Sequence, residues 1–213
     1  FMGVEPDALI QSKGNSLVIK YSDGREEVME GNPLDSLKEF YSSFDVSNEE
    51  SELEFNGGLV GSLGYDFIRY IEKIPDNNPD EIGIETIQLM LADKFIAINH
   101  TAETFTAVVL GEDEEEGRIK ALKEAEELIK TAREGVDKFN DDTPDMSLDG
   151  VILKKSDTLE QYSKKVNKIK NYIKEGHIFQ TVLSQRWTIK TGQSGFNLYE
   201  KLRELNPSPY MYY

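Results

Sequence analysis

Apolar and polar residues alternate in short runs over the first part of the chain, and this alternation predicts a small antiparallel meander. The runs have the two-residue period of a strand and cover residues 8–11, 17–21 and 26–30. Gly14-Asn15 and Ser22-Asp23-Gly24 lie between them, and both sequences are typical of hairpin turns. Further β segments are predicted at residues 85–91, 95–99, 104–110 and 151–154.

Apolar residues recur at helical spacing in four other stretches. Asn32-Pro33 opens the first, where a proline suits the first helical turn. Asp157 and Glu160 are spaced as in a capping box at the start of the third, with Ser156 as the alternative cap. Gly176 is predicted to end that helix. The four predicted helices cover residues 33–41, 112–138, 157–175 and 197–205.

A long strand is predicted over residues 179–189. Its apolar face carries Phe179, Leu183, Trp187 and Ile189. The other face carries Gln180, Ser184 and Arg186, and an amide, a hydroxyl and a guanidinium on one side of a sheet can bind a small polar anion. The same alternation is typical of an ordinary half-buried strand, so the pattern leaves both interpretations open. Residues 210–213 also have high strand propensity.

Residues 57–64 include four glycines. A phosphate-binding loop is one interpretation, but such a loop ends in Lys-Ser or Lys-Thr and opens a long helix, and this segment does neither. The other interpretation is that the glycines let a buried strand pass close to other backbone. We expect the second.

Composition narrows the class of protein. The 213 residues are 38% hydrophobic and 30% charged, with no Cys and no apolar run as long as a membrane span. This predicts a soluble globular protein without disulfides or thiolate metal sites, which we expect in the cytoplasm. The net charge of −16 argues against nucleic acid and anionic membranes as partners.

Charge divides the chain into two parts of opposite sign. Residues 150–213 hold 11 Lys and Arg against 5 Asp and Glu, a net +6, which leaves −22 for residues 1–149. The sign changes at residues 139–150, a polar, acidic stretch typical of a linker. We therefore predict an acidic domain over residues 1–149 and the beginning of a second domain over residues 150–213. The opposite charges would attract the two domains or suit a dicarboxylate substrate, unless the acidic surface serves solubility alone.

No catalytic constellation is visible after residue 150. Proton transfer needs a group that titrates near neutral pH, and metal assistance needs clustered carboxylates or imidazoles. This region has one His, no Cys and five carboxylates, all on predicted helices at capping or surface positions. We expect the lone His177 to be incidental.

Three motifs carry a resemblance to a known family. Residues 57–70 are the glycine-rich segment, residues 176–186 read Gly-His-Ile-Phe-Gln-Thr-Val-Leu-Ser-Gln-Arg, and residues 206–211 read Asn-Pro-Ser-Pro-Tyr-Met. In order and spacing they resemble component I of anthranilate synthase, the large subunit that uses chorismate. Ser62 stands where that family commonly has Tyr. The resemblance covers essentially the whole chain and about the first half of the family's usual length.

The resemblance implies a fold class. We expect an α+β protein, a largely antiparallel sheet with packed helices like that of anthranilate synthase component I, truncated before the catalytic half. The chain starts abruptly at Phe1 and stops inside a predicted strand at Tyr213, although natural chains seldom leave an aromatic strand edge unpaired. We therefore expect a piece cut at both ends. By resemblance, the catalytic residues and the glutamates that bind Mg²⁺ belong to the missing half, so we expect no metal or other cofactor on this chain.

The resemblance also implies roles for residues that are present. Gln180 stands where enzymes that make isochorismate have a Lys base, and an amide cannot act as that base, so Gln180 is a candidate for lining the pocket of an aminating enzyme. The other wall of the family's inhibitor site, a Leu-Leu-Glu-Ser motif, would precede Phe1. The segment that holds the inhibitor tryptophan matches Pro209, Tyr210 and Met211, with Asn206 and Ser208 beside them.

The function implied is that of a lyase in tryptophan biosynthesis. With Mg²⁺, the family's enzyme converts chorismate and ammonia to anthranilate and pyruvate, and a glutamine amidotransferase subunit, component II, supplies the ammonia. Aminodeoxychorismate synthase of the folate pathway is the alternative, although the sequence Pro-Ser-Pro-Tyr-Met at residues 207–211 favours anthranilate. A non-catalytic docking or regulatory module is a third possibility. We expect residues 1–213 by themselves to be inactive.

Overall fold

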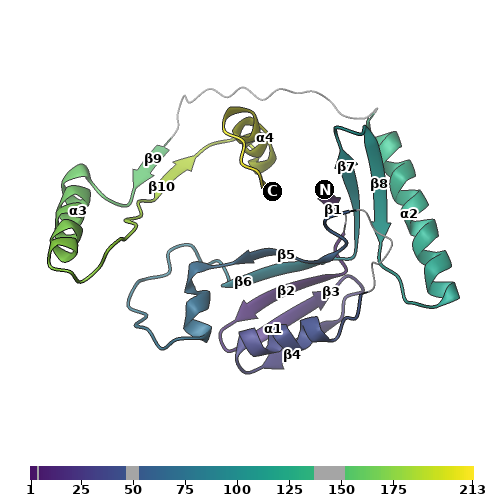
Figure 1. Ribbon diagram of the computed structural model, residues 1–213, viewed down its shortest axis with the longest axis horizontal. Helices are drawn as coiled ribbons and strands as arrows, with labels where there is room; N and C mark the ends of the chain where they lie inside the picture. Colours follow the sequence, from purple (N-terminus) through teal and green to yellow (C-terminus); the bar gives the residue numbers. More distant parts are fainter. Residues whose placement is uncertain (4, 47–52, 137–151) are drawn as a thin grey trace. The chain divides into compact units, whose positions relative to one another are not determined.

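Two compact units make up the chain. The computed structural model describes residues 1–3, 5–46, 53–136 and 152–213. The units are residues 1–139 and 140–213, and each is described by itself. Strands and helices occur in both (Figure 1). The predicted linker and the predicted boundary after residue 149 lie outside the described residues.

A five-stranded antiparallel sheet forms the centre of the first unit (Figure 1). In the order β4-β3-β2-β6-β5, its strands are β4 (Glu26–Glu30), β3 (Ser16–Tyr21), β2 (Ala8–Lys13), β6 (Ile87–Ala92) and β5 (Gly58–Leu63). Gly14 and Gly24 have φ of +60° and +89° in the two turns, a conformation that glycine adopts readily. The predicted meander is therefore confirmed.

Helix α1 (Pro33–Ser42) packs on this sheet. It begins as predicted, since the Asn32 side chain accepts a hydrogen bond of 3.0 Å from the backbone N–H of Leu34. Alternate residues of each strand point to the same face, so the two-residue period of the sequence decides which side chains enter the core. The buried core consists of Ala8, Ile10, Leu17, Ile19, Phe40, Ile87 and Leu91.

Ser12 is buried beside this core, where its Oγ accepts a 3.0 Å hydrogen bond from the backbone N–H of Ile87. Ser12→Ala leaves that buried donor without a partner, so we expect the free energy of unfolding to fall by about 1–3 kcal/mol. Denaturant titration followed by circular dichroism measures the change. Ser42→Ala is the matched control, because the exposed Ser42 hydroxyl donates only to the carbonyl of Lys38. Equal losses in the two variants would contradict the prediction.

A three-stranded sheet follows in the same unit. Its order is β1-β7-β8, with β1 at Met2–Gly3, β7 at Lys94–Asn99 and β8 at Thr104–Val109. Helix α2 (Glu115–Val136) packs on β8 and β7 (Figure 1). Asp93 alone separates β6 from β7, so the chain passes from one sheet to the other at this residue. The two-residue strand β1 was not predicted, because two residues show no periodicity.

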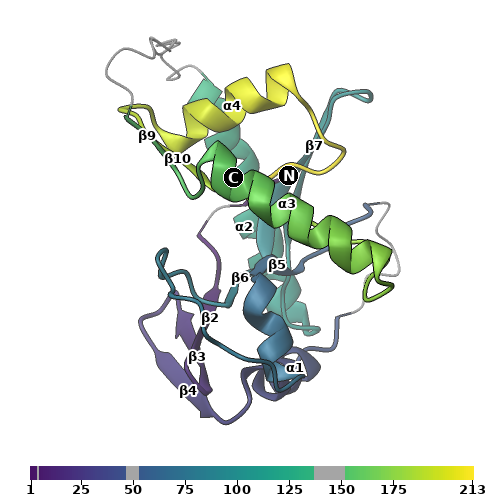
Figure 2. The same ribbon diagram turned by 90° about the vertical axis from the view of Figure 1, so that its left-hand side faces the viewer.

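In residues 152–213, the described part of the second unit, there are a pair of strands and two helices (Figure 2). The elements are β9 (Ile152–Lys155), α3 (Leu159–Lys174), β10 (Trp187–Lys190) and α4 (Gly195–Leu205), and β9 and β10 pair antiparallel. Gly176 follows α3 with φ +77°, as predicted for its end.

The predicted cap of α3 is wrong by one residue. Thr158 is the N-cap, and its side chain forms the capping box with Gln161. The pair Thr158 and Gln161 has the same three-residue spacing as Asp157 and Glu160, so the sequence pattern did not separate the two. Asp157 instead accepts hydrogen bonds of 2.6 and 2.8 Å from Lys165 Nζ.

Two strand predictions near the end of the chain are also wrong. Residues 179–186 are not a strand, because a strand needs a partner and β9 pairs only from Lys155, which lies opposite Trp187. Residues 210–213 have no regular secondary structure. The ring of Tyr213 packs on α4 instead, with ring centroids 5.5 Å from Phe196 and 6.0 Å from Tyr199.

Candidate functional site

The glycine-rich segment forms β5 and then a short 3₁₀ helix, η1 (Tyr65–Tyr70). β5 pairs with β6 along its whole length. A Cβ on Gly61 would overlap the carbonyl oxygen of Gln88 and would lie 2.9 Å from Cα of Leu89. The close backbone approach is therefore confirmed, and a six-residue 3₁₀ helix is not the long helix of a phosphate-binding loop.

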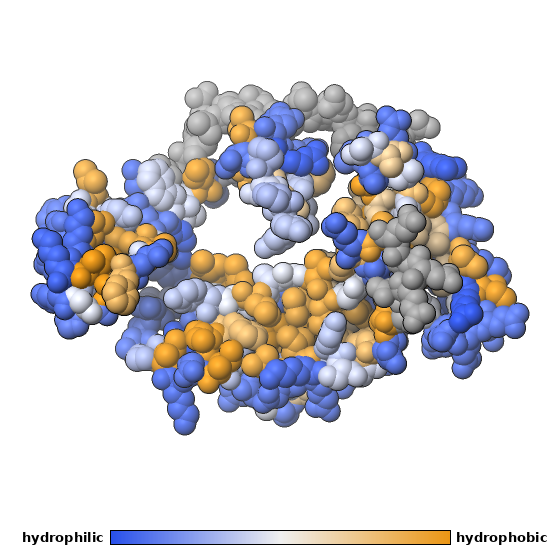
Figure 3. Space-filling model, in the orientation of Figure 1, coloured by the Kyte–Doolittle hydropathy of each residue, from blue (hydrophilic) through white to orange (hydrophobic). Residues whose placement is uncertain are grey.

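The prediction that this strand is buried is wrong. β5 lies at the edge of the five-stranded sheet, and residues 60–63 are exposed. Val60 and Leu9 both lie opposite Met90 of β6, and all three side chains are exposed. Hydrophobic residues accordingly appear on the surface of the first unit (Figure 3). The glycines indicated a strand but not whether its faces are covered.

Gln180 lies in the connection between α3 and β10, and its side chain is exposed. Hydrogen bonds hold this connection near both ends. The backbone N–H of His177 donates to the carbonyl of Tyr172 at 2.9 Å, and Gln185 Nε2 donates to the carbonyl of Asp157 at 3.0 Å. The two ends of α3 therefore position the stretch that carries Gln180.

Among the described residues of this unit, Asp157 is the one buried carboxylate. Its partner Lys165 lies on α3, with Nζ 2.6 Å from Oδ1. A buried charge is stable only when it is paired, so this contact fixes the start of α3 and, through the Asp157 carbonyl, Gln185. The sequence analysis missed this ion pair, because Asp157 lies outside the helix and the separation of eight residues is not a helical spacing.

The segment predicted to hold an inhibitor follows α4. Asn206 is the C-cap of this helix, and its backbone N–H donates to the carbonyl of Leu202 at 2.9 Å. Met211 is half-buried, whereas Tyr210 is 88% exposed. The structure thus presents a largely exposed loop consisting of Asn206, Ser208, Pro209, Tyr210 and Met211. Among the described residues, no hydrogen bond or ring contact joins this loop to Gln180.

Lowered pKa values occur at exposed carboxyl groups, among them those of Glu204 and Asp80. The Lys201 ammonium, 2.8 Å from Glu204 on α4, lowers the pKa of that carboxyl through a hydrogen bond and its charge. The backbone N–H groups of Gly83 and Ile82 lower the pKa of Asp80. Both carboxyl groups are exposed and remain ionised at neutral pH.

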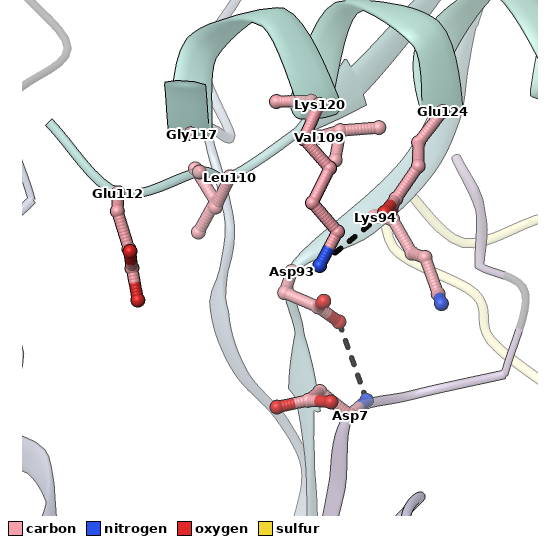
Figure 4. A pocket seen from close by; sticks show the side chains of 11 residues that line it. Asp7, Asp93, Lys94, Val109, Leu110, Glu112, Gly117, Lys120 and Glu124 are labelled. Atoms are coloured by element: carbon pink, nitrogen blue, oxygen red, sulfur yellow. Dashed lines mark hydrogen bonds and ion pairs between the residues drawn. The ribbon is translucent and has the colours of Figure 1, made fainter. Parts of the chain in front are cut away.

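A pocket of about 440 Å³ lies in the first unit, between the start of α2 and the junction of β6 with β7 (Figure 4). Charged side chains of both signs surround it. Asp93 Oδ1 accepts a 3.3 Å hydrogen bond from the backbone N–H of Asp7, and Lys120 Nζ lies 4.0 Å from Glu124 Oε1. The pocket contains none of the site residues predicted from the sequence.

Metal-ligating side chains are not clustered in the part of the chain that the structure describes. Within residues 1–3, 5–46, 53–136 and 152–213, no group of three or more His, Cys, Asp or Glu residues is placed to hold a metal ion. Among the described helices, none is both long and apolar enough to cross a membrane.

Comparison with known proteins assigns the family. Residues 3–213 match the family described as chorismate binding enzyme. The chain belongs to the chorismate binding enzyme family. Anthranilate synthase component 1 of Acetivibrio thermocellus is 32% identical and matches 100% of this chain and 44% of its own length. The Pseudomonas aeruginosa protein of the same name is 35% identical over 85% of this chain and 38% of its own.

Two further relatives extend this comparison. Aminodeoxychorismate synthase component 1 of Bacillus subtilis is 30% identical and matches 99% of this chain and 44% of its own length. The crystal structure of anthranilate synthase component I from Streptococcus pneumoniae superposes with a TM-score of 0.78 at 25% identity, over 99% of this chain and 46% of that one. This member of the chorismate binding family therefore spans about half the length of the relatives it matches, and the predicted α+β fold of anthranilate synthase component I is confirmed.

Proposed function

We propose that this chain is part of an anthranilate synthase component 1, a lyase that converts chorismate and ammonia to anthranilate and pyruvate. The observation that carries the proposal is the match to the Acetivibrio thermocellus protein, which includes all of this chain at 32% identity. The sequence Pro-Ser-Pro-Tyr-Met at residues 207–211 supports the same product. A cytoplasmic location fits a biosynthetic enzyme of this kind.

Gln180 is proposed to line the chorismate pocket. Its exposed amide can donate and accept hydrogen bonds but cannot remove a proton from water, which fits amination by ammonia and not hydration. Tryptophan is proposed as the inhibitor at the loop after α4, where Tyr210 and Met211 offer apolar surface and Asn206 and Ser208 offer hydrogen bonds. Pro209 restricts the backbone between them.

The described residues include no cluster of three or more metal-ligating side chains that could bind the family's Mg²⁺. We therefore derive no step through the ion from this chain. The proposed role of residues 1–213 is to contribute one wall of the pocket and the inhibitor loop. A glutamine amidotransferase subunit is the proposed partner, and co-purification of the two polypeptides tests this.

Aminodeoxychorismate synthase is the second candidate. The 30% identity to the Bacillus subtilis protein, over 99% of this chain, supports this second function. Both candidates use an aminating pocket, so Gln180 does not separate them. A non-catalytic docking or regulatory role of the 213 residues by themselves is compatible with either.

Residues 1–213 by themselves are expected to form no anthranilate from chorismate, ammonia and Mg²⁺, because the described residues contain no metal-ligating cluster. Anthranilate fluorescence measures the rate. In the same assay, we expect product when the chain is combined with the part of the Acetivibrio thermocellus enzyme that it does not match. Turnover by the chain alone would refute the inactivity. Formation of aminodeoxychorismate by the combination would favour the second candidate.

A further inference from the structure

The pocket of the first unit lies where the chain passes from one sheet to the other. Asp93 alone separates β6 from β7, and Asp7 stands immediately before β2, so both residues belong to connections between the three-stranded and the five-stranded sheet. The opposite wall is the first part of α2, from Gly117 to Glu124 (Figure 4). Both sheet connections and α2 therefore contribute to this pocket.

Hydrogen bonds and close contacts hold the walls of the pocket in place. The backbone N–H of Leu110, between β8 and α2, donates to the carbonyl of Asp93 at 2.8 Å. The backbone N–H of Asp7 donates to Asp93 Oδ1 at 3.3 Å. A Cβ on Gly111 would lie 2.9 Å from Cβ of Ala121, so this connection packs closely on α2. The pocket is therefore formed without a ligand, and a preformed site loses little conformational entropy on binding.

The size and the lining of the pocket indicate a charged small molecule. Its volume of about 440 Å³ falls in the range of small-molecule sites, about 300–1,000 Å³. The charged side chains that line it are those of Asp7, Asp93, Lys94, Glu112, Lys120 and Glu124. Val109, Leu110 and Ala121 line it as well and offer apolar surface. A ligand that fits this lining carries charges of both signs and a short apolar chain.

The six charged side chains hardly pair with one another. The one ion pair among them joins Lys120 Nζ to Glu124 Oε1 at 4.0 Å. Lys94 is half-buried and forms no ion pair with any described residue. The Asp7 carboxylate accepts a 3.0 Å hydrogen bond from the Ser22 hydroxyl, which is neutral. Four carboxylates against two ammonium groups give the lining a net charge of −2, so the pocket favours a ligand with more positive than negative groups.

We propose that this pocket binds a basic amino acid. The ligand's carboxylate contacts the ammonium groups of Lys94 and Lys120, its two cationic groups contact the carboxylates around them, and its methylene chain lies on the apolar side chains. A simple anion is disfavoured by the net negative charge, and a bare metal ion is disfavoured because the described residues form no metal-ligating cluster. No residue of the pocket takes part in the proposed function, so the two proposals are independent.

Titration of the 213-residue chain with L-lysine, followed by the amide chemical shifts in two-dimensional NMR, tests the site. We expect saturable shifts at the amides of Asp93, Lys94 and Lys120, with a Kd in the millimolar range because each exposed charge pair contributes little. The amide of Gly14 is the internal reference, since it lies at the opposite end of β2 from Asp7. The proposal is wrong if L-lysine at up to about 50 mM, well above a millimolar Kd, leaves the pocket amides unshifted.

Two analogues separate recognition of the whole ligand from a general attraction of cations. L-norleucine lacks the side-chain ammonium of L-lysine, and cadaverine lacks its carboxylate. At about 0.15 M salt, where long-range attraction is screened, we expect each analogue to bind at least about twofold more weakly than L-lysine. If cadaverine binds as tightly, the pocket attracts any cation and the proposal is wrong. If L-norleucine binds as tightly, the carboxylates do not recognise the side chain of the ligand, and the proposal is also wrong.

A substitution on α2 tests the contact with the ligand's carboxylate. Lys120→Met removes the ammonium and keeps an unbranched apolar side chain, so we expect it to raise the Kd for L-lysine about two- to fivefold and not to raise that for cadaverine. Lys123→Met is the matched control, because Lys123 lies on the same helix but does not line the pocket. Equal effects of the two substitutions on L-lysine, or equal effects of Lys120→Met on both ligands, would overturn the proposal.

Discussion

Replacing Gly61 with Ala is expected to lower the free energy of unfolding of the first unit by about 4 kcal/mol or more, an exceptional effect for one methyl group. Gly61 has φ +151°, which side-chain-bearing residues rarely adopt, and the new Cβ would overlap the carbonyl oxygen of Gln88. The overlap is with backbone, so no side-chain rotation relieves it. β5 must move away from β6 and lose hydrogen bonds along the sheet edge.

Gly58→Ala is the matched control for this effect. Gly58 lies on the same strand with φ +130°, but nothing lies within 4 Å of a Cβ built there. It should cost only the backbone strain, about 1–3 kcal/mol. Denaturant titration followed by circular dichroism compares both variants with the parent chain. If Gly61→Ala costs no more than Gly58→Ala, the close approach of β5 to β6 is not what requires glycine at residue 61.

Phe95→Ala is expected to lower the free energy of unfolding by about 3–5 kcal/mol, the usual cost of removing a buried aromatic ring. Phe95 is only 1% exposed. Its ring contacts Phe1 and Phe55, with centroid distances of 5.8 and 5.1 Å, so one substitution removes both ring contacts and leaves a cavity. We also expect the contact of β1 with β7 to loosen, which faster amide exchange at Met2 and Gly3 would report.

Phe105→Ala is the control for this substitution. Phe105 lies on β8, the strand next to β7. Phe105→Ala removes the same number of atoms as Phe95→Ala, but the Phe105 side chain is 60% exposed. It should cost less than about 1 kcal/mol, since little of its surface is taken out of water. Similar losses for Phe95→Ala and Phe105→Ala would mean that the three-ring cluster does not stabilise the unit.

Local periodicity explains which elements were predicted correctly. The meander at residues 8–30, the helix after Asn32 and the helix that ends at Gly176 each have a signal within a few neighbouring residues: alternation, a capping side chain, or a glycine with positive φ. The family was also predicted from local signals, since three short motifs indicated it by their order and spacing. The sites inferred from that resemblance, at Gln180 and residues 206–211, stay predictions.

The errors occur where a distant residue decides the outcome. Residues 179–186 alternate like a strand, but no strand lies beside them among the described residues. Asp157 has the spacing of a capping box, but Lys165 binds its carboxylate. In both cases the local signal was present and the long-range partner differed, which a pattern over neighbouring residues does not contain.

The sequence by itself determined the type of most elements, the α+β class and the family, because backbone preferences and short motifs depend on adjacent residues. Only the tertiary structure decided which strands pair: that β6 and β7, separated by Asp93, enter different sheets, that β5 is an exposed edge, and that residues 179–186 join no strand among the described residues. Pairing joins residues far apart in the chain, and the alternation of one strand is the same whichever neighbour it has.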